Sequence, residues 1–367
     1  MGSGAVRFPA AQNKDRLKGD FYFKVGELYN HHMKFLAGVV VVVGSFFLIF
    51  QSKVTDFAPD FKAEKLENII ERKEPSLNII FAGDVMLGRA VEGRYNEVDL
   101  FENVSEAFKS ADAVIANLEG PILNNHIKTP NNSYKFSFAT TTLSILKTAG
   151  FTDLSLANNH TDNYGRNGFV ETVLNLKSID LNAFGDPNLI SDYSFIRREI
   201  GGSSFVFAGV NDTYGNLSVK NIVEFGSNLR SQFPTDILVF VIHWGEEYKI
   251  TANLRQEEIG RGLIDEGVDL IIGSHPHVVQ NIEKYKDKYI FYSLGNFVFD
   301  QYFSTSTQEG LVVKMSERES CRFELLPVNI KRSVPELMEY PQKDIWLKEY
   351  SMNSGELSQF VSSGCLK

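Results

Sequence analysis

The sequence has few cysteines and no surplus of basic residues beyond its first part. Cys321 and Cys365 are too few for a disulfide framework or a zinc-ribbon site. Cys365 is third from the end, in a segment expected to fray, so a disulfide is not predicted. The net charge is −9, and the excess of basic residues is confined to residues 1–53. General nucleic-acid binding is therefore excluded, because a basic surface supplies most of its affinity.

Long hydrophobic runs are equally scarce, and a single one decides the predicted localisation. Residues 35–52 carry no charge between Lys34 and Lys53 and would extend about 27 Å as a helix, close to the thickness of a bilayer core. A buried core helix is the alternative. A cleaved signal peptide is disfavoured, because the run begins late and no small-residue cleavage site follows it. The sequence thus predicts a single-pass membrane anchor.

Positive charge near this run predicts its orientation. Residues 1–34 are rich in Lys and Arg, whereas the basic residues after the run are offset by acidic ones. The N-terminal arm is therefore predicted to be cytoplasmic and the body extracytoplasmic.

The rest of the chain alternates between apolar runs and amphipathic stretches. Residues 53–76 are polar and predict a stalk, residues 77–331 predict one mixed α/β domain, and residues 332–367 predict a peripheral tail. The predicted strands are 77–82, 113–117, 153–157, 205–209, 237–242, 268–272 and 289–293. The predicted helices are 100–110, 142–148, 167–178 and 254–266. Two later pieces, 311–315 and 323–330, alternate in polarity as antiparallel strands do.

Polar signatures directly follow five of the apolar runs. They are FAGDVMLGR, IANLEGPI, LANNHTDNYG, VIHWGEEY and GSHPHVVQ. In α/β sheets functional groups gather beyond the carboxyl ends of strands, so one site at one edge of a sheet is predicted. Gly83, just before Asp84, is predicted to allow a sharp backbone turn.

The side chains in these signatures suit hard divalent metal ions. Asp84, Glu119 and Asn159 offer oxygen, whereas His243, His275 and His277 offer nitrogen. Taken alone, Asp84 fits ordinary turn chemistry, and His243 fits a satisfied core histidine. The His275-x-His277 spacing places both imidazoles on one side of an extended segment, a common metal-binding geometry.

Three further residues are candidates for catalysis. His160 can act as an acid over the metals, and Asp162 can orient its ring, with a loop cap as the alternative. Arg89 can pair with a carboxylate or phosphate of a substrate, with a surface ion pair as the alternative.

The ordered motifs GDVMLGR, NLEGPI, ANNHTDNYG, HWGEEY, GSHPHVVQ and SLGNFVFDQ resemble the CapA family of capsule-synthesis proteins. That family is bacterial, includes the poly-γ-glutamate synthesis component and is similar to calcineurin-like metallophosphoesterases. The resemblance implies a four-layer α/β/β/α sandwich with two divalent ions, manganese, iron or zinc. It also implies an anionic polymer or phosphoester substrate and synthase subunits in the bacterial cell membrane as partners.

When the ligand roles of the family are carried over to the matching motif positions, the resemblance implies that the ligands are divided between two metals. Asp84 and His277 would bind the first metal, Glu119 would bridge, and Asn159, His243 and His275 would bind the second. His160 would protonate a leaving group. Met86 stands where the phosphoesterase pattern has a metal-binding His, and the Glu of NLE replaces a second Gly-Asp.

Three functions follow from these features. The first is a membrane-anchored protein of capsule or exopolymer production with a metal-dependent hydrolase or transfer site. The second is a metallophosphoesterase acting on phosphoesters of the cell envelope. The third is a non-catalytic scaffold that binds the polymer within a membrane synthase.

Overall fold

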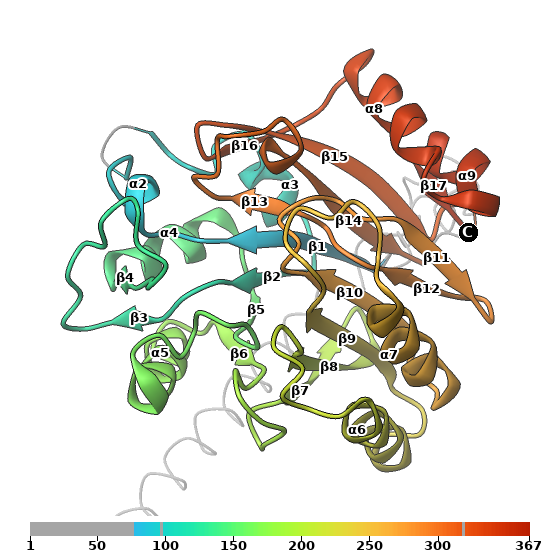
Figure 1. The fold of residues 1–367 in the computed structure, drawn as a ribbon, viewed down its shortest axis with the longest axis horizontal. Helices are drawn as coiled ribbons and strands as arrows, with labels where there is room; N and C mark the ends of the chain where they lie inside the picture. Colours follow the sequence, from blue (N-terminus) through green and yellow to red (C-terminus); the bar gives the residue numbers. More distant parts are fainter. Residues whose placement is uncertain (1–76, 96–97, 318–319) are drawn as a thin grey trace, which may run out of the picture. The chain divides into compact units, whose positions relative to one another are not determined.

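The computed structural model describes residues 77–95, 98–317 and 320–367 (Figure 1). The predicted arm, anchor and stalk, residues 1–76, lie outside these ranges. Within the described ranges, no helix is long and apolar enough to cross a membrane. This finding corrects the predicted localisation as a single-pass protein of the bacterial cell membrane.

A nine-stranded sheet forms the first half of the domain. β1, β2, β5 and β6 run parallel, whereas β14, β15 and β16 continue the sheet from β1 in antiparallel fashion. β13 pairs with β1, and β17 pairs with β15. The bounds are β1 (Asn78–Val85), β2 (Ala113–Leu118), β5 (Asp153–Ser155), β6 (Asn182–Phe184), β13 (Asn296–Val298), β14 (Glu309–Ser316), β15 (Phe323–Lys331), β16 (Val334–Leu337) and β17 (Cys365–Leu366).

A six-stranded sheet forms the second half. β8, β9, β10 and β12 run parallel, with β7 and β11 added antiparallel at the two edges. The bounds are β7 (Phe195–Ile200), β8 (Ser203–Asn211), β9 (Ile237–His243), β10 (Leu270–Ser274), β11 (Ile282–Tyr285) and β12 (Lys288–Phe291). A separate two-stranded piece pairs β3 (Ile122–Leu123) with β4 (Phe138–Ala139).

Helices lie against the sheets and around the loops. Their bounds are α2 (Arg89–Glu92), α3 (Ser105–Lys109), α4 (Thr141–Ala149), α5 (Gly165–Lys177), α6 (Val219–Gln232), α7 (Leu254–Asp265), α8 (Gln342–Ser351) and α9 (Ser358–Ser362), with 3-10 turns η1 (Ser306–Gln308) and η2 (Gly355–Leu357). α7 begins with a capping box, in which Asn253 accepts from the Gln256 amide and the Gln256 side chain bonds back.

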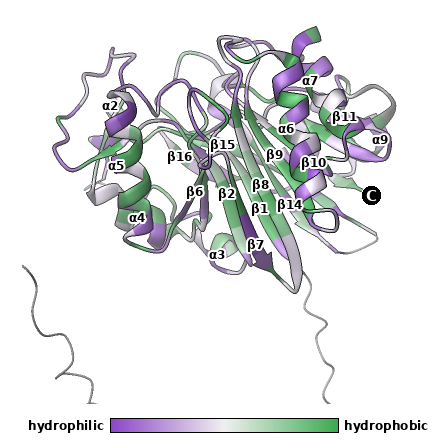
Figure 2. Ribbon diagram, turned by 90° about the horizontal axis from the view of Figure 1, so that it is seen from below, coloured by the Kyte–Doolittle hydropathy of each residue, from purple (hydrophilic) through white to green (hydrophobic). Residues whose placement is uncertain are grey.

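Alternate residues of each central strand face different cores, because side chains alternate along a strand. In β1, Ile80 packs toward the core that includes helices α4 and α5, whereas Phe81 packs toward the second sheet. In β9, Val239 faces the first sheet, and Phe240 faces the core that includes α6 and α7. Figure 2 shows the apolar strands between these two helix pairs. The prediction of a mixed α/β fold is confirmed.

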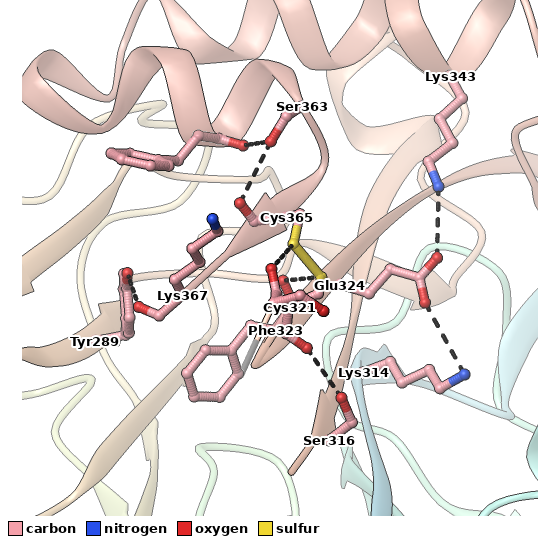
Figure 3. The surroundings of a disulfide bond; sticks show 12 residues. Tyr289, Lys314, Ser316, Cys321, Phe323, Glu324, Lys343, Ser363, Cys365 and Lys367 are labelled. Carbon is pink, nitrogen blue, oxygen red and sulfur yellow. Dashed lines mark hydrogen bonds and ion pairs between the residues drawn. A yellow bond between two sulfur atoms is a disulfide. The ribbon is translucent and has the colours of Figure 1, made fainter. Parts of the chain in front are cut away.

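Residues 332–367 are part of the folded domain rather than a peripheral tail. β16 and β17 pair with β15, and Leu347, Val361 and Leu366 are buried in the core between the sheets. The pairing places Cys365 opposite Glu324, and Cys365 forms a disulfide with Cys321 (Figure 3). A frayed terminus, expected from the position of Cys365 in the sequence, would not bring the two cysteines together. The observed strand pairing places their Cα atoms 5.4 Å apart.

Gly83 marks a close approach between backbones rather than the sharp turn predicted from the sequence. A Cβ atom there would lie 2.0 Å from the carbonyl oxygen of Gly295, which accepts a hydrogen bond from the Asp84 amide at 3.0 Å. Gly83→Ala is therefore expected to lower the free energy of unfolding by about 2–3 kcal/mol in urea titrations.

Gly93→Ala is the matched control for this variant. Residue 93 has an ordinary helical φ of −62°, and its nearest neighbours would lie 3.4 Å from a Cβ atom. Its free energy of unfolding should change by less than about 0.5 kcal/mol. Equal losses in the two variants would contradict the close-approach explanation.

Candidate metal centre

The predicted metal ligands converge, but they come from two sheets rather than from one sheet edge. Asp84 lies in β1 and Glu119 follows β2 of the larger sheet, whereas His243 ends β9 of the smaller sheet. His275 and His277 follow β10, next to β9. The site therefore lies where the carboxyl ends of parallel strands from both sheets meet.

One group of ligand atoms consists of Asp84, Glu119 and His277. Their ligand atoms all lie within 4.8 Å of one another, and all three residues are buried. His277 Nδ1 is 3.4 Å from Asp84 Oδ2, and His277 Nε2 is 3.8 Å from Glu119 Oε1. This is the set that the family resemblance assigned to the first metal and its bridge.

A second group adjoins the first and shares His277. Glu247, His275 and His277 also place ligand atoms within 4.8 Å of one another. The rings of His243 and His275 are 4.8 Å apart, and His243 Nε2 lies 2.9 Å from Asn159 Oδ1. Sequence reasoning missed Glu247, because an exposed glutamate in a polar loop carries no pattern of its own.

The His-x-His segment is not extended, which corrects the prediction made from its spacing. His275 and His277 have φ values of 97° and 58°, both in the left-handed region. Their ring centroids lie 5.8 Å apart. A strained turn rather than strand alternation thus brings the two imidazoles together, and such strain is characteristic of functional sites.

Two of the buried side-chain atoms that lack a hydrogen-bond partner within the described part of the chain belong to predicted metal ligands. They are Glu119 Oε1 and His275 Nδ1, and neither has a hydrogen bond. A buried carboxylate oxygen or imidazole nitrogen without a partner is costly. Both atoms are ligand types for hard or borderline divalent ions, so the residues present fit a metal centre.

Burial controls the protonation of the histidines. It lowers the pKa of His275 to about 3, with a further contribution from His277. It also lowers the pKa of His243 well below its ordinary value, with His275 and His277 adding to the effect. Both rings are therefore neutral near pH 7, the form that binds metals.

Glu119 and His277 form a coupled buried pair. Burial raises the pKa of Glu119 to about 8, against the opposing effect of His277. Burial alone would lower the pKa of His277, but Glu119 and Asp84 raise it to about 9. A cation at this position would favour the ionised carboxylate and the neutral ring instead.

Behind the ligands lies a chain of amides that sequence reasoning missed. Asn158 accepts from the backbone amides of His160 and Thr161, and its Nδ2 donates to Asn117 Oδ1 at 2.9 Å. Asn117 Nδ2 in turn donates to Asp84 Oδ1 at 2.7 Å. Asn117 ends an apolar run, and a polar side chain at that position is typical of the end of a strand. Its position two residues before Glu119 was the available signal.

Of the predicted catalytic residues, His160 faces the centre and Asp162 does not orient it. His160 Nε2 is 3.8 Å from Glu119 Oε1, and burial lowers the pKa of His160 to about 4. Its Nδ1 contacts Asn163 Oδ1 at 3.2 Å, whereas Asp162 accepts a hydrogen bond from Asn188.

Arg89 forms an ion pair within the chain, which is the alternative that the sequence left open for it, and Met86 supplies no metal ligand. The Arg89 guanidinium pairs with Asp300, donates to the Ser133 carbonyl and lies 4.7 Å from the Phe136 ring centroid. Met86 is buried in the helix-facing core, and its Sδ accepts from the Gly88 amide at 3.1 Å.

This chain is similar to a known protein family and to individual known proteins. The family described as "Bacterial capsule synthesis protein PGA_cap" matches residues 78–301. "Capsule biosynthesis protein CapA" of Bacillus anthracis is 32% identical over 298 residues, which cover 75% of this chain and 72% of the relative. "PGA biosynthesis protein CapA" of Bacillus subtilis (strain 168) is 31% identical over 277 residues, 71% of this chain and 73% of the relative. Every predicted metal ligand falls inside residues 78–301, the range that the family matches.

Proposed function

Because the chain belongs to the bacterial capsule synthesis protein family, we propose that it is a metal-dependent hydrolase or transferase of capsule polymer production. Its substrate is an anionic polymer of the poly-γ-glutamate type, and synthase subunits are its partners. The stacking of two sheets between helices supports a sandwich of the metallophosphoesterase type. The observation that carries the proposal is the buried Glu119 Oε1, which has no hydrogen-bond partner among the described residues and lies between two histidine nitrogens.

The two ligand groups suggest two divalent ions. Asp84, Glu119 and His277 would hold one of them, and His275, His243 and Asn159 would hold the other, with Glu247 in reach of His275. Manganese, iron and zinc all suit this oxygen and nitrogen set. When bound, such ions lower the pKa of a coordinated water and polarise a phosphoryl or carbonyl oxygen.

The chain's own residues supply positioning and proton transfer. Asn117 holds the Asp84 carboxylate, and Asn296 Oδ1 holds the His277 ring at Nδ1, 3.0 Å away. His160 presents Nε2 to the centre beside Glu119 and is the residue placed to move a proton.

A polymer-binding scaffold is the second candidate, and Met86 favours it. The Met86 side chain points into the core, so it supplies no ligand where the phosphoesterase pattern has a histidine. A centre with fewer ligands can bind without catalysing. Loss of His160 separates the two functions, because a scaffold tolerates it and a hydrolase does not.

The first test is the metal content of the full chain beside a His275→Ala/His277→Ala variant. We expect about two ions per chain after loading with Mn²⁺ or Zn²⁺, and at most a trace in the variant. His126→Ala is the matched control, because His126 bonds to Glu92 and Ser137 away from both ligand groups. A chain without bound metal after loading would overturn the proposed metal centre.

Hydrolysis is tested on the same preparations with a phosphodiester and with γ-linked glutamate oligomers. We expect metal-dependent turnover that His160→Gln reduces at least about 100-fold while the metal content stays unchanged. Turnover of the phosphodiester alone would favour a phosphoesterase. Metal binding without turnover of either substrate would favour the scaffold.

A further inference from the structure

We propose that Asn163 is the positioning residue for His160, fixing hydrogen on Nδ1 and leaving the lone pair of the neutral ring on Nε2, toward Glu119. The role of this tautomer in a reaction rests on the proposed function. The tautomer itself follows from hydrogen-bond geometry and can be measured without any activity.

The orientation of the Asn163 amide is fixed by the backbone. The Phe136 amide lies 2.6 Å from the Asn163 side chain and can only donate a hydrogen bond. The atom facing it must therefore be Oδ1 rather than Nδ2. This contact removes the usual ambiguity between the two ends of an asparagine amide.

The same Oδ1 atom fixes the tautomer of His160. It lies 3.2 Å from His160 Nδ1, and an amide oxygen can only accept. Nδ1 must therefore carry hydrogen. Stacking on the Phe136 ring, with centroids 4.0 Å apart, holds the imidazole plane in place. Asn163 thus anchors both partners, the ring of His160 and the backbone of Phe136.

An independent part of the site is built in the same way. Asn296 Nδ2 donates to the backbone carbonyl of Thr307 at 2.9 Å, so its Oδ1 faces His277 Nδ1 at 3.0 Å. His277 Nδ1 therefore also carries hydrogen. The Nε2 atoms of His160 and His277 then both face Glu119 Oε1, each at 3.8 Å. Two amides, each oriented by a backbone group, direct both histidines toward one carboxylate oxygen.

This tautomer reverses the direction of the first proton transfer implied by the family resemblance. A residue that protonates a leaving group at the outset needs hydrogen on the atom facing it, which here is Nε2. A neutral His160 with a bare Nε2 instead accepts a proton from the attacking water, or from the alcohol group of an acceptor in a transfer reaction, and becomes an imidazolium. It can return that proton to the leaving group, so that the ring ends the cycle unchanged.

The test is ¹⁵N NMR of the full chain, labelled at histidine, treated with chelator and recorded at pH 8. The His160 resonances are identified by their loss in His160→Gln. We expect the Nδ1–H pattern in the wild type and in Asn163→Asp, which retains an acceptor. Asn163→Ala should lose the preference for Nδ1–H. An Nε2–H pattern in the wild type, or an unchanged pattern in Asn163→Ala, would overturn the proposal.

Asp162→Asn is the matched control, since Asp162 bonds to Asn188 and not to the ring. Its His160 spectrum should match the wild type, and a lost Nδ1–H pattern in this variant would assign the positioning role to Asp162 instead. Should Asn163→Ala fail to fold, the wild type and Asn163→Asp still decide the tautomer. Because these spectra need neither metal nor substrate, they distinguish failure of this proposal from failure of the proposed hydrolase.

Discussion

Replacing Glu119 by Gln is expected to abolish stabilisation of the chain by Mn²⁺ or Zn²⁺ and to make the metal-free chain more stable. Glu119 is fully buried, and its Oε1 has no hydrogen-bond partner among the residues the structure describes. Burial raises the pKa of this carboxyl, which shows that the metal-free fold disfavours its charge. An uncharged amide of the same size avoids that penalty. His277, whose pKa is raised chiefly by Glu119, can lose its proton in the variant, so no unpaired charge is left and the metal-free variant should gain about 1–3 kcal/mol.

The stabilisation by metal that Glu119→Gln loses should be about as large as the stability that the metal-free variant gains. An ion present at 100 times its dissociation constant stabilises the wild type by about 2.7 kcal/mol, and the variant should show almost none of this. Urea unfolding with and without metal measures both effects. Glu247→Gln is the comparison, because Glu247 is exposed and should not change the metal-free stability. Equal stabilisation of Glu119→Gln and wild type by metal would contradict the assignment of Glu119 as a ligand.

The central strands were predictable because a strand that is buried on both faces is apolar at successive positions. The run over β9 is apolar on both faces, since one face packs on the other sheet and one on helices. Helix α6 was missed because Gly226 and several polar residues dilute its pattern. Ile222, Phe225 and Leu229 are its buried face, and their helical spacing was the available signal.

The candidate ligands were predicted from their position directly after apolar strands. The division of those strands between two sheets was not predictable. Strand endings look the same whether the strands join one sheet or two, so the site was placed at a single sheet edge. The left-handed turn at His275 and His277 leaves no signature in sequence either, because positive φ values are uncommon in residues other than Gly. Long-range hydrogen bonds such as Asn163 to Phe136 depend on packing between loops.

The two sheets that meet at this centre are also joined by an ion pair, which gives the largest expected change in stability. Arg198 of β7 in the smaller sheet pairs with Asp153 of β5 in the larger one. The Asp153 side chain is fully buried and also accepts from Thr152 Oγ1 at 2.6 Å. Arg198→Met leaves this carboxylate without its cation and should cost about 3 kcal/mol in free energy of unfolding. Lys220→Met, which removes an exposed pair with Glu224, should cost less than about 0.5 kcal/mol.

The loss in free energy of unfolding caused by Arg198→Met should depend on pH, because Asp153 is buried and titratable. Burial raises the pKa of Asp153 even though Arg198 opposes this, so the pKa must rise further once the arginine is removed. A carboxyl whose pKa is higher in the folded than in the unfolded state favours folding at low pH, and that contribution is lost as pH rises through the folded value. Urea unfolding should therefore show a smaller penalty at pH 5 than at pH 8. Adding Asp153→Asn should recover most of the loss at pH 8, because no buried charge is then left without a partner. A penalty independent of pH, or no recovery in the double variant, would mean that Arg198 stabilises the two sheets through packing alone.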